Sequence, residues 1–93
     1  MGTDVDIETL YKAVRRRFSY SAAEGILRNK NTGLPAGYTR SDGYIQVRVN
    51  KVLYYAHHLI WLYSYGQLNF KGLVLDHING DNTDNRIINL REA

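Results

Sequence analysis

The residues best suited to chemistry lie together near the end of the chain. Asp76 and His77 follow a short apolar segment, residues 72–75, and a polar loop with five more carbonyl-bearing side chains comes next: Asn79, Asp81, Asn82, Asp84 and Asn85. A carboxylate can hold a hard divalent cation, and an imidazole can accept a proton near neutral pH. Because neighbouring side chains of a strand point to opposite faces, Asp76 and His77 can serve one site only if the chain turns directly after them. The Asn79-Gly80 pair favours such a turn.

A calcium loop of the EF-hand type is the first alternative, and the spacing excludes it. Counted from Asp76, the third position is Ile78 and the sixth is Asp81, where the EF-hand needs an oxygen ligand and a glycine. The second alternative is a surface loop whose Asn and Asp side chains bond to nearby backbone. We expect Asn82 to have that role.

The length and composition limit the kinds of protein that the chain can be. Its 93 residues suit one domain, 1–93, and 44% hydrophobic with 23% charged residues is typical of a globular protein. The lack of cysteine excludes a disulfide scaffold, a thiolate zinc finger and a cysteine nucleophile. The chain has no apolar run near the roughly 18 residues of a membrane span, and its acidic N-terminus is unlike a secretory signal.

Charge is distributed unevenly along the chain. Residues 25–75 carry six Lys or Arg against one Asp, whereas residues 76–93 carry four acids against two Arg. A basic middle beside an acidic end indicates a polyanion-binding surface next to a cation site, with ordinary surface charge as the alternative. The candidate DNA-binding residues are Arg28, Arg40, Arg48 and Lys51. The arginines at 15–17 should lie in the last turn of a helix, where cations interact favourably with the helix dipole; we favour this role over contact with phosphate.

The pattern of apolar residues predicts an α+β fold. Residues 4–17 carry one apolar stripe, and Thr3 with Asp6 resembles a capping box, so 1–19 should hold an N-terminal helix. Residues 20–66 should form a small antiparallel sheet and a central helix: 44–50 alternate, Asn50-Lys51 suits a hairpin turn, 52–56 return, and 57–65 end at Gly66. Buried positions should be Ile45, Val47, Val49, Leu59, Ile60, Trp61 and Leu75.

Two stretches carry a resemblance to a known family. GYIQVRVNKVLYYAHHLIW, from Gly43, and DHINGDNTDNRIINLREA, from Asp76, closely resemble the HNH endonucleases of phages and of intron-borne homing enzymes. The resemblance runs from about Tyr20 to Ala93, and the ordered set of D-H-I-N-G-D and D-N-R-x-x-N-L-R is specific. It implies a ββα-metal nuclease that hydrolyses phosphodiester bonds of double-stranded DNA with one divalent metal.

The resemblance also implies a role for each site residue. Asp76 matches the metal-binding acid, His77 the general base, and Asn89 the asparagine that holds the base and the loop. Asn85 matches a structural asparagine, and His57 an upstream histidine for which a supporting role is expected. The expected metal is Mg²⁺, with Mn²⁺ or Zn²⁺ as alternatives. His58 stands where the family usually has Arg, which removes one phosphate or carboxylate contact.

One departure from the family lies at the end of the chain. The helix that carries the last signature residue should begin where the chain stops, at Ala93, so residues 72–93 are expected to be a partial HNH motif without its C-terminal helix. We therefore expect an incomplete nuclease domain, with a homodimer as one way to cover the surface left by that helix. The expected setting is the cytoplasm of a bacterial or phage-infected cell. The alternatives are a non-catalytic DNA-binding module that uses the basic hairpin and a structural domain with a vestigial site.

Overall fold

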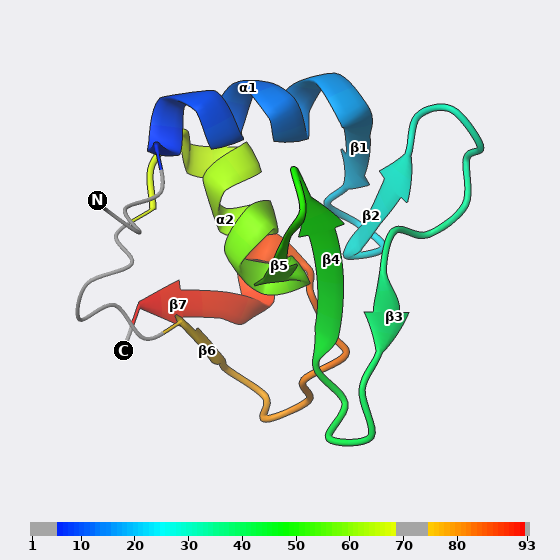
Figure 1. Ribbon diagram of the computed structural model, residues 1–93. Coiled ribbons are helices and arrows are strands. Elements are labelled where there is room, and N and C mark those ends of the chain that lie inside the picture. Colours follow the sequence, from blue (N-terminus) through cyan, green and yellow to red (C-terminus); the bar gives the residue numbers. More distant parts are fainter. Residues whose placement is uncertain (1–5, 69–74, 93) are drawn as a thin grey trace.

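The computed structural model describes residues 6–68 and 75–92, so Thr3 and positions 72–74 of the expected strand lie outside it. Two helices and three small antiparallel sheets make up this part of the chain, which confirms the α+β prediction (Figure 1). The elements are α1 (Ile7–Arg17), β1 (Phe18–Ser21), β2 (Ile26–Asn29), β3 (Tyr38–Thr39), β4 (Ile45–Val49), β5 (Val52–Tyr55), α2 (Ala56–Tyr65), β6 (Leu75–His77), the 3₁₀ helix η1 (Ile87–Asn89) and β7 (Leu90–Glu92). The sheets pair β1 with β2, β3 with β4 and β5, and β6 with β7.

The first helix begins at Ile7, later than the sequence suggested. The Asp6 side chain is the N-cap and accepts hydrogen bonds from the backbone N–H groups of Glu8 at 3.1 Å and Thr9 at 3.3 Å. Asp6 therefore satisfies donors at the helix start itself, which corrects the expected start at residue 4. The apolar stripe of α1 is buried against α2.

The β4–β5 hairpin forms in the register that the alternation predicted. Val49 pairs with Val52 across the turn, and both turn residues have positive φ, 50° at Asn50 and 70° at Lys51. Two successive residues of positive φ match the right-handed twist of the flanking strands. Val47 and Val49 are buried and Arg48 between them is exposed, so one face of β4 enters the core.

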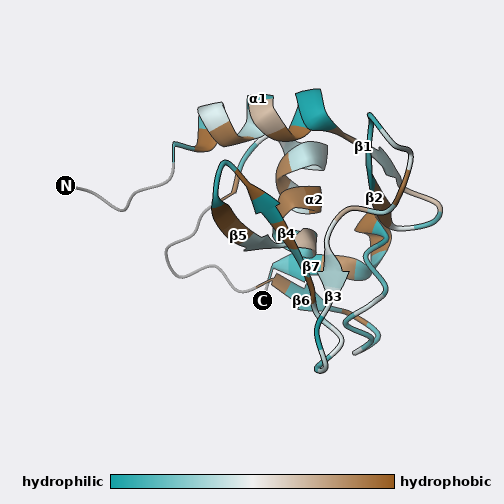
Figure 2. Cartoon of the chain, turned by 45° about the vertical axis from the view of Figure 1, so that its right-hand side comes forward, coloured by the Kyte–Doolittle hydropathy of each residue, from teal (hydrophilic) through white to brown (hydrophobic). Residues whose placement is uncertain are grey.

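The second helix lies at the centre of the molecule. Its residues Ala56, Leu59, Ile60 and Leu62 are buried, and it contacts α1, β4, β5 and η1. Figure 2 shows hydrophobic residues on α2 and on the side of α1 that faces it. Gly66 ends the helix with φ 74°, and its N–H donates to the Leu62 carbonyl at 2.8 Å. This αL ending is the one predicted from the sequence.

Five of the seven residues predicted to be buried are buried, and two are only partly so. Ile45 and Trp61 pack against the core cluster from its edge. The Trp61 ring lies 4.5 Å from the exposed Tyr65 ring, centroid to centroid, so it covers the core while one side meets solvent. The buried face of α2 thus includes Leu62, which was not predicted, and leaves Trp61 at its edge. No helix within the described residues has the length and apolar character to cross a lipid bilayer.

Candidate active site

Asp76 and His77 end strand β6, and the chain turns directly after them. The Gly80 N–H donates to the His77 carbonyl at 2.9 Å, which closes the turn that the sequence analysis required. The alternation of the strand still separates the two side chains. His77 is 4% exposed, whereas the Asp76 side chain is 44% exposed and accepts from the Arg91 guanidinium at 3.0 Å across the β6–β7 pair.

The His77 imidazole is fixed by a buried asparagine. Its Nε2 lies 2.7 Å from Oδ1 of Asn85, which is 2% exposed. An amide oxygen can only accept, so this contact assigns the proton to Nε2 and leaves the lone pair of the neutral ring on Nδ1. The arrangement selects one tautomer and one orientation of the imidazole.

A second buried asparagine, Asn89, holds the loop rather than the imidazole. Its Oδ1 accepts from the backbone N–H of Asn79 at 3.1 Å, and its Nδ2 donates to Asn79 Oδ1 at 3.0 Å and to the Asp84 carbonyl at 2.9 Å. These bonds join both ends of the 79–86 loop. The structure therefore places Asn85 against the base candidate and Asn89 against the loop, and the roles predicted for both remain predictions.

Most polar side chains of the 79–86 loop bond within the loop. Asp81 accepts from the Thr83 N–H at 2.9 Å and hydroxyl at 2.6 Å, and the hydroxyl contact lowers the pKa of the Asp81 carboxyl. Asp84 accepts two hydrogen bonds of 2.8 Å from the Arg86 guanidinium, which lowers the pKa of Asp84. The surface-loop interpretation thus describes this segment well.

Two residues outside the recognised motif anchor the loop from behind, and sequence reasoning missed both. The Tyr20 hydroxyl donates to the Asn85 carbonyl at 2.7 Å, and burial raises the pKa of Tyr20, which keeps this proton in place. Gly25 lies so close to the loop that a Cβ there would be 2.5 Å from the backbone nitrogen of Arg86. A glycine at position 25 suits a turn, but nothing local in the sequence shows what that turn approaches.

Aromatic rings and histidines surround the other side of His77. The centroid of the His57 ring lies 4.7 Å from that of His77 and 4.5 Å from that of His58. The centroids of the Tyr44 and His77 rings are 6.1 Å apart. His57 is 4% exposed; burial, and then the charges of His58 and His77, lowers its pKa to about 3. Burial also lowers the pKa of His58. His57 is therefore neutral near pH 7 and contacts the base candidate directly.

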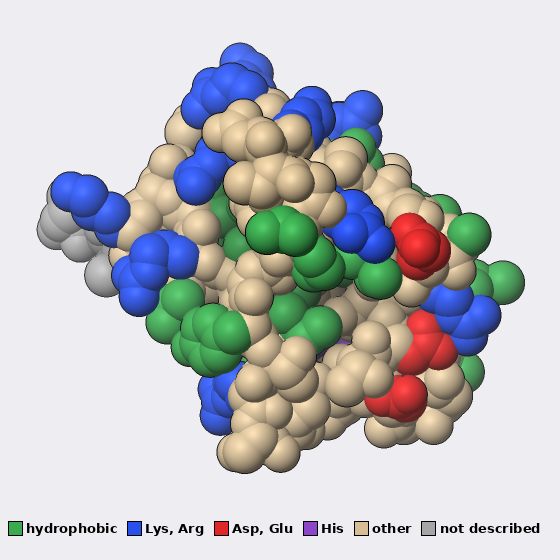
Figure 3. Space-filling view, turned by 90° about the vertical axis from the view of Figure 1, so that its right-hand side faces the viewer, with side chains coloured by type: hydrophobic (Ala, Val, Ile, Leu, Met, Phe, Trp, Pro, Cys, Tyr) green, Lys and Arg blue, Asp and Glu red, His purple; other side chains and the backbone are tan. Residues whose placement is uncertain are grey.

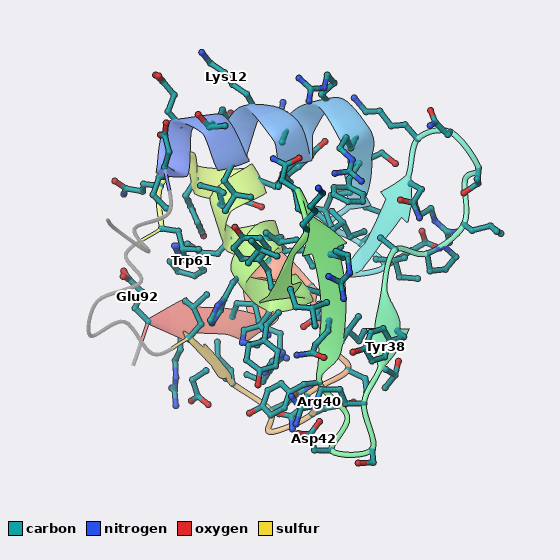
Figure 4. All side chains as sticks on the ribbon, in the orientation of Figure 1. Lys12, Tyr38, Arg40, Asp42, Trp61 and Glu92 are labelled. Carbon is teal, nitrogen blue, oxygen red and sulfur yellow. The ribbon has the colours of Figure 1, made fainter. Side chains whose placement is uncertain are left out.

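The basic residues predicted to bind DNA do not form one cluster. Arg28 donates to the Gly33 carbonyl at 3.0 Å and lies 3.8 Å from Glu24. Arg40 lies 3.2 Å from Asp42 and 3.4 Å from the Tyr55 hydroxyl. Figure 4 shows Arg40 and Asp42 together at the end of the molecule where the β3–β4 turn meets the 79–86 loop. The Asn82 side chain bonds to the Asp42 carbonyl there at 3.2 Å.

Arg48 and Lys51 lie at the other end of β4, on the hairpin. Both are exposed, and the Arg48 guanidinium donates to the Lys51 carbonyl at 3.4 Å. Within residues 6–68 and 75–92, neither forms an ion pair. Of the four candidates, these two keep their charge unpaired for a ligand.

The donor set for a metal is small. In the part of the chain that the structure describes, no three His, Cys, Asp or Glu side chains are grouped to hold a metal ion. Asp76 supplies one half-exposed carboxylate, and Arg91 uses one of its oxygens. A single carboxylate fits hydrated Mg²⁺, which keeps most of its waters, and does not fit Zn²⁺, which needs three or four protein ligands.

The surface expected to mediate a homodimer is only partly present. Of the apolar residues near the end of the chain, Ile88 is 77% exposed, whereas Leu75 is 7% exposed, as predicted. A buried Leu75 leaves less apolar area for a partner, and dimerisation remains a prediction.

Comparisons with known proteins cover the region that contains these residues. Residues 54–93, which run from β5 through the 79–86 loop to β7, match the family model described as HNH endonuclease. The structure resembles that of the HNH homing endonuclease I-HmuI, described in connection with DNA binding and cleavage, with a TM-score of 0.60 and 23% identity over 83% of this chain. This chain spans 46% of that chain. No curated protein matches it.

Residues 54–93 thus match the HNH endonuclease family, and the fold of the chain resembles that of an HNH homing endonuclease.

Proposed function

We propose that this chain is the nuclease region of a metal-dependent DNA endonuclease, with His77 as its general base. The observation that carries the proposal is the 2.7 Å contact between His77 Nε2 and the buried Asn85 Oδ1. A base must be held in one orientation with its lone pair available, and this contact supplies both. The family match over residues 54–93 supports the same chemistry.

In this mechanism Nδ1 of His77 accepts a proton from a water molecule as the water oxygen attacks phosphorus. The new P–O bond forms as the bond to the 3′ oxygen breaks, which leaves a 5′-phosphate and a 3′ oxyanion that takes up a proton from solvent to become a hydroxyl. Asn85 keeps the imidazole aligned throughout, and its amide oxygen stabilises the imidazolium through Nε2–H. Asp76 would hold the hydrated metal, which supplies positive charge for the phosphate oxygens and the departing 3′ oxygen.

The substrate that we propose is duplex DNA, held first through the hairpin. Arg48 and Lys51 are exposed, adjacent and unpaired with acids among the described residues. Contacts of Lys and Arg to phosphates position a protein on DNA without reading sequence, and they weaken as salt increases.

One observation favours a second function, a DNA-binding module without turnover. The Asp76 carboxylate already accepts two hydrogen bonds from Arg91, at 3.0 and 3.2 Å. That ion pair competes with a metal for the same oxygen. In such a module the hairpin would bind DNA and the β6–β7 pair would be structural.

Cleavage of supercoiled plasmid with and without Mg²⁺ tests the proposal. In a full-length protein that carries this region, we expect cleavage that depends on the metal, and its loss in His77→Ala with duplex binding preserved. Metal-independent binding with no cleavage, equal in the wild type and His77→Ala, would establish the second function. Cleavage by His77→Ala at the wild-type rate would refute the assignment of the base.

A further inference from the structure

A polar cleft lies between the end of α1 and the segment that follows β2, away from the site described above. It has a volume of about 300 Å³ and is lined by Arg16, Arg17, Asn29 and Asn31. Two arginines and two asparagines thus line the cleft, and no acidic residue does. Such a set of donors suits an anion with several acceptor oxygens.

The helix end does not need these two arginines. The Arg15 guanidinium lies 4.2 Å from the Tyr63 ring centroid and donates to the Tyr63 carbonyl at 3.3 Å. The Lys30 ammonium donates to the Arg15 carbonyl at 2.7 Å, and the Lys30 N–H donates to the Arg17 carbonyl at 3.0 Å. Lys30 thus satisfies carbonyls at the end of α1 and supplies the cation that its dipole favours.

Arg16 and Arg17 therefore carry charge beyond what the helix uses. Both are exposed, and within residues 6–68 and 75–92 neither forms an ion pair. All three arginines of the 15–17 triplet lie in the last turn of α1, as the sequence predicted, and the exposed Arg16 and Arg17 can contact a ligand as well.

The cleft continues the basic surface of the hairpin. Helix α1 contacts β4, and the β4–β5 turn that carries Lys51 reaches up to α1 in Figure 1. Figure 3, which shows the side of the molecule that bears β2 and β3, has Lys and Arg side chains along its upper and left parts, whereas acidic side chains gather at its right. A polyanion that follows the basic part of this face avoids the acids.

We propose that this cleft is a second contact for the phosphate backbone of duplex DNA, in addition to Arg48 and Lys51. The inference rests on the proposed function, since it names a further part of the same DNA-binding surface. Two guanidiniums that each neutralise one phosphate release two counterion equivalents, which steepens the salt dependence of binding.

The test is the affinity for duplex DNA, measured by fluorescence anisotropy at salt concentrations from about 50 to about 200 mM. Each lost phosphate contact should reduce the slope of log K against log salt by about 0.9, so Arg16→Gln with Arg17→Gln should reduce it by about 2. Lys12→Gln is the matched control. It removes a charge from the same helix, its side chain is 71% exposed and lies 4.0 Å from Glu8, and in Figure 4 it points away from the rest of the molecule.

The outcomes separate the two proposals. A reduced slope in the double variant, with the wild-type slope in Lys12→Gln, supports the cleft. If the wild type binds duplex DNA and the double variant keeps its slope, the cleft proposal is wrong and the proposed function stands. An equal reduction of the slope in Lys12→Gln and in each single arginine variant would show a general charge effect, and this result would also overturn the cleft proposal. Absence of duplex binding by the wild type would overturn both proposals.

Discussion

Replacement of Asn85 by alanine tests the geometry of the base most directly. The Asn85 side chain is 2% exposed and its Oδ1 is the 2.7 Å partner of His77 Nε2, while its backbone carbonyl bonds separately to Tyr20. The substitution therefore removes the imidazole partner and keeps the Tyr20 bond. It leaves a buried N–H without an acceptor, which costs about 1–3 kcal/mol, and the small void adds to this.

The expected total is about 2–4 kcal/mol of unfolding free energy, within the 5–15 kcal/mol of an ordinary domain. Activity should fall by about 10- to 100-fold among the molecules that stay folded, because partners that orient a reacting group have effects of this size. Urea unfolding gives the first quantity, and single-turnover plasmid cleavage, corrected for the folded fraction, gives the second.

The tautomer of His77 provides a readout that a merely structural role would not change. Long-range ¹H–¹⁵N NMR of the imidazole should show Nε2–H in the wild type and a mixture of tautomers in Asn85→Ala. Asn89→Ala is the matched control, since Asn89 is also buried and bonds to Asn79 and Asp84 instead. It should lose stability with the tautomer unchanged. A wild type with Nδ1–H, or an Asn85→Ala variant with unaltered tautomer and rate, would refute the reasoning.

Three further predictions concern the surroundings of the site. Gly25→Ala should lower the free energy of unfolding by about 2–3 kcal/mol, because the φ of Gly25 is 72° and a Cβ there would lie 2.5 Å from the Arg86 backbone. Gly33→Ala is the control: its φ is 73°, a Cβ there would have no neighbour within 4 Å, and it should cost only about 1 kcal/mol. Equal losses of the two variants in urea unfolding would contradict the prediction. Burial lowers the pKa of His57 from 6.5 to about 3, so below pH 6.5 the unfolded chain binds a proton that the folded chain does not. The free energy of unfolding should therefore be highest above pH 6.5 and should be lower by about 2 kcal/mol at about pH 5. In His57→Phe, the urea midpoints at about pH 5 and above pH 6.5 should differ less than in the wild type. Asp76→Asn should weaken Mn²⁺ binding, measured by electron paramagnetic resonance, with little effect on stability because the side chain is 44% exposed; unchanged Mn²⁺ affinity would remove Asp76 as the metal ligand.

The elements that rest on local patterns could be predicted from the sequence. Alternation around Val47 gave the register of β4, Asn50 marked the hairpin turn, and Gly66 marked the end of α2, because each signal lies within a few residues of its effect. The start of α1 was placed too early, since Asp6 can cap the following turn as well as pair with a residue before it.

The contacts that organise the site could not be predicted in the same way. Asn85 and Asn89 are the same residue type four positions apart, and only the path of the loop decides which of them meets His77. The bond from Tyr20 to Asn85 joins positions 65 residues apart, and a single sequence carries no signal for such a pair. Sequence reasoning therefore named Asn85 and Asn89 as supporting residues, but it could not tell which of them contacts His77, and it missed the bond from Tyr20.

The close approach of the β1–β2 turn to the 79–86 loop limits how this nuclease motif can be transferred between proteins. The family match begins at residue 54, yet the loop is held by the hydroxyl of Tyr20 and by the space that Gly25 leaves free. A chimera built from residues 54–93 alone would leave behind one hydrogen bond and one packing surface of its loop. A fusion of this motif to a new DNA-binding protein must therefore include residues 18–29, because that hairpin fixes the conformation of the 79–86 loop.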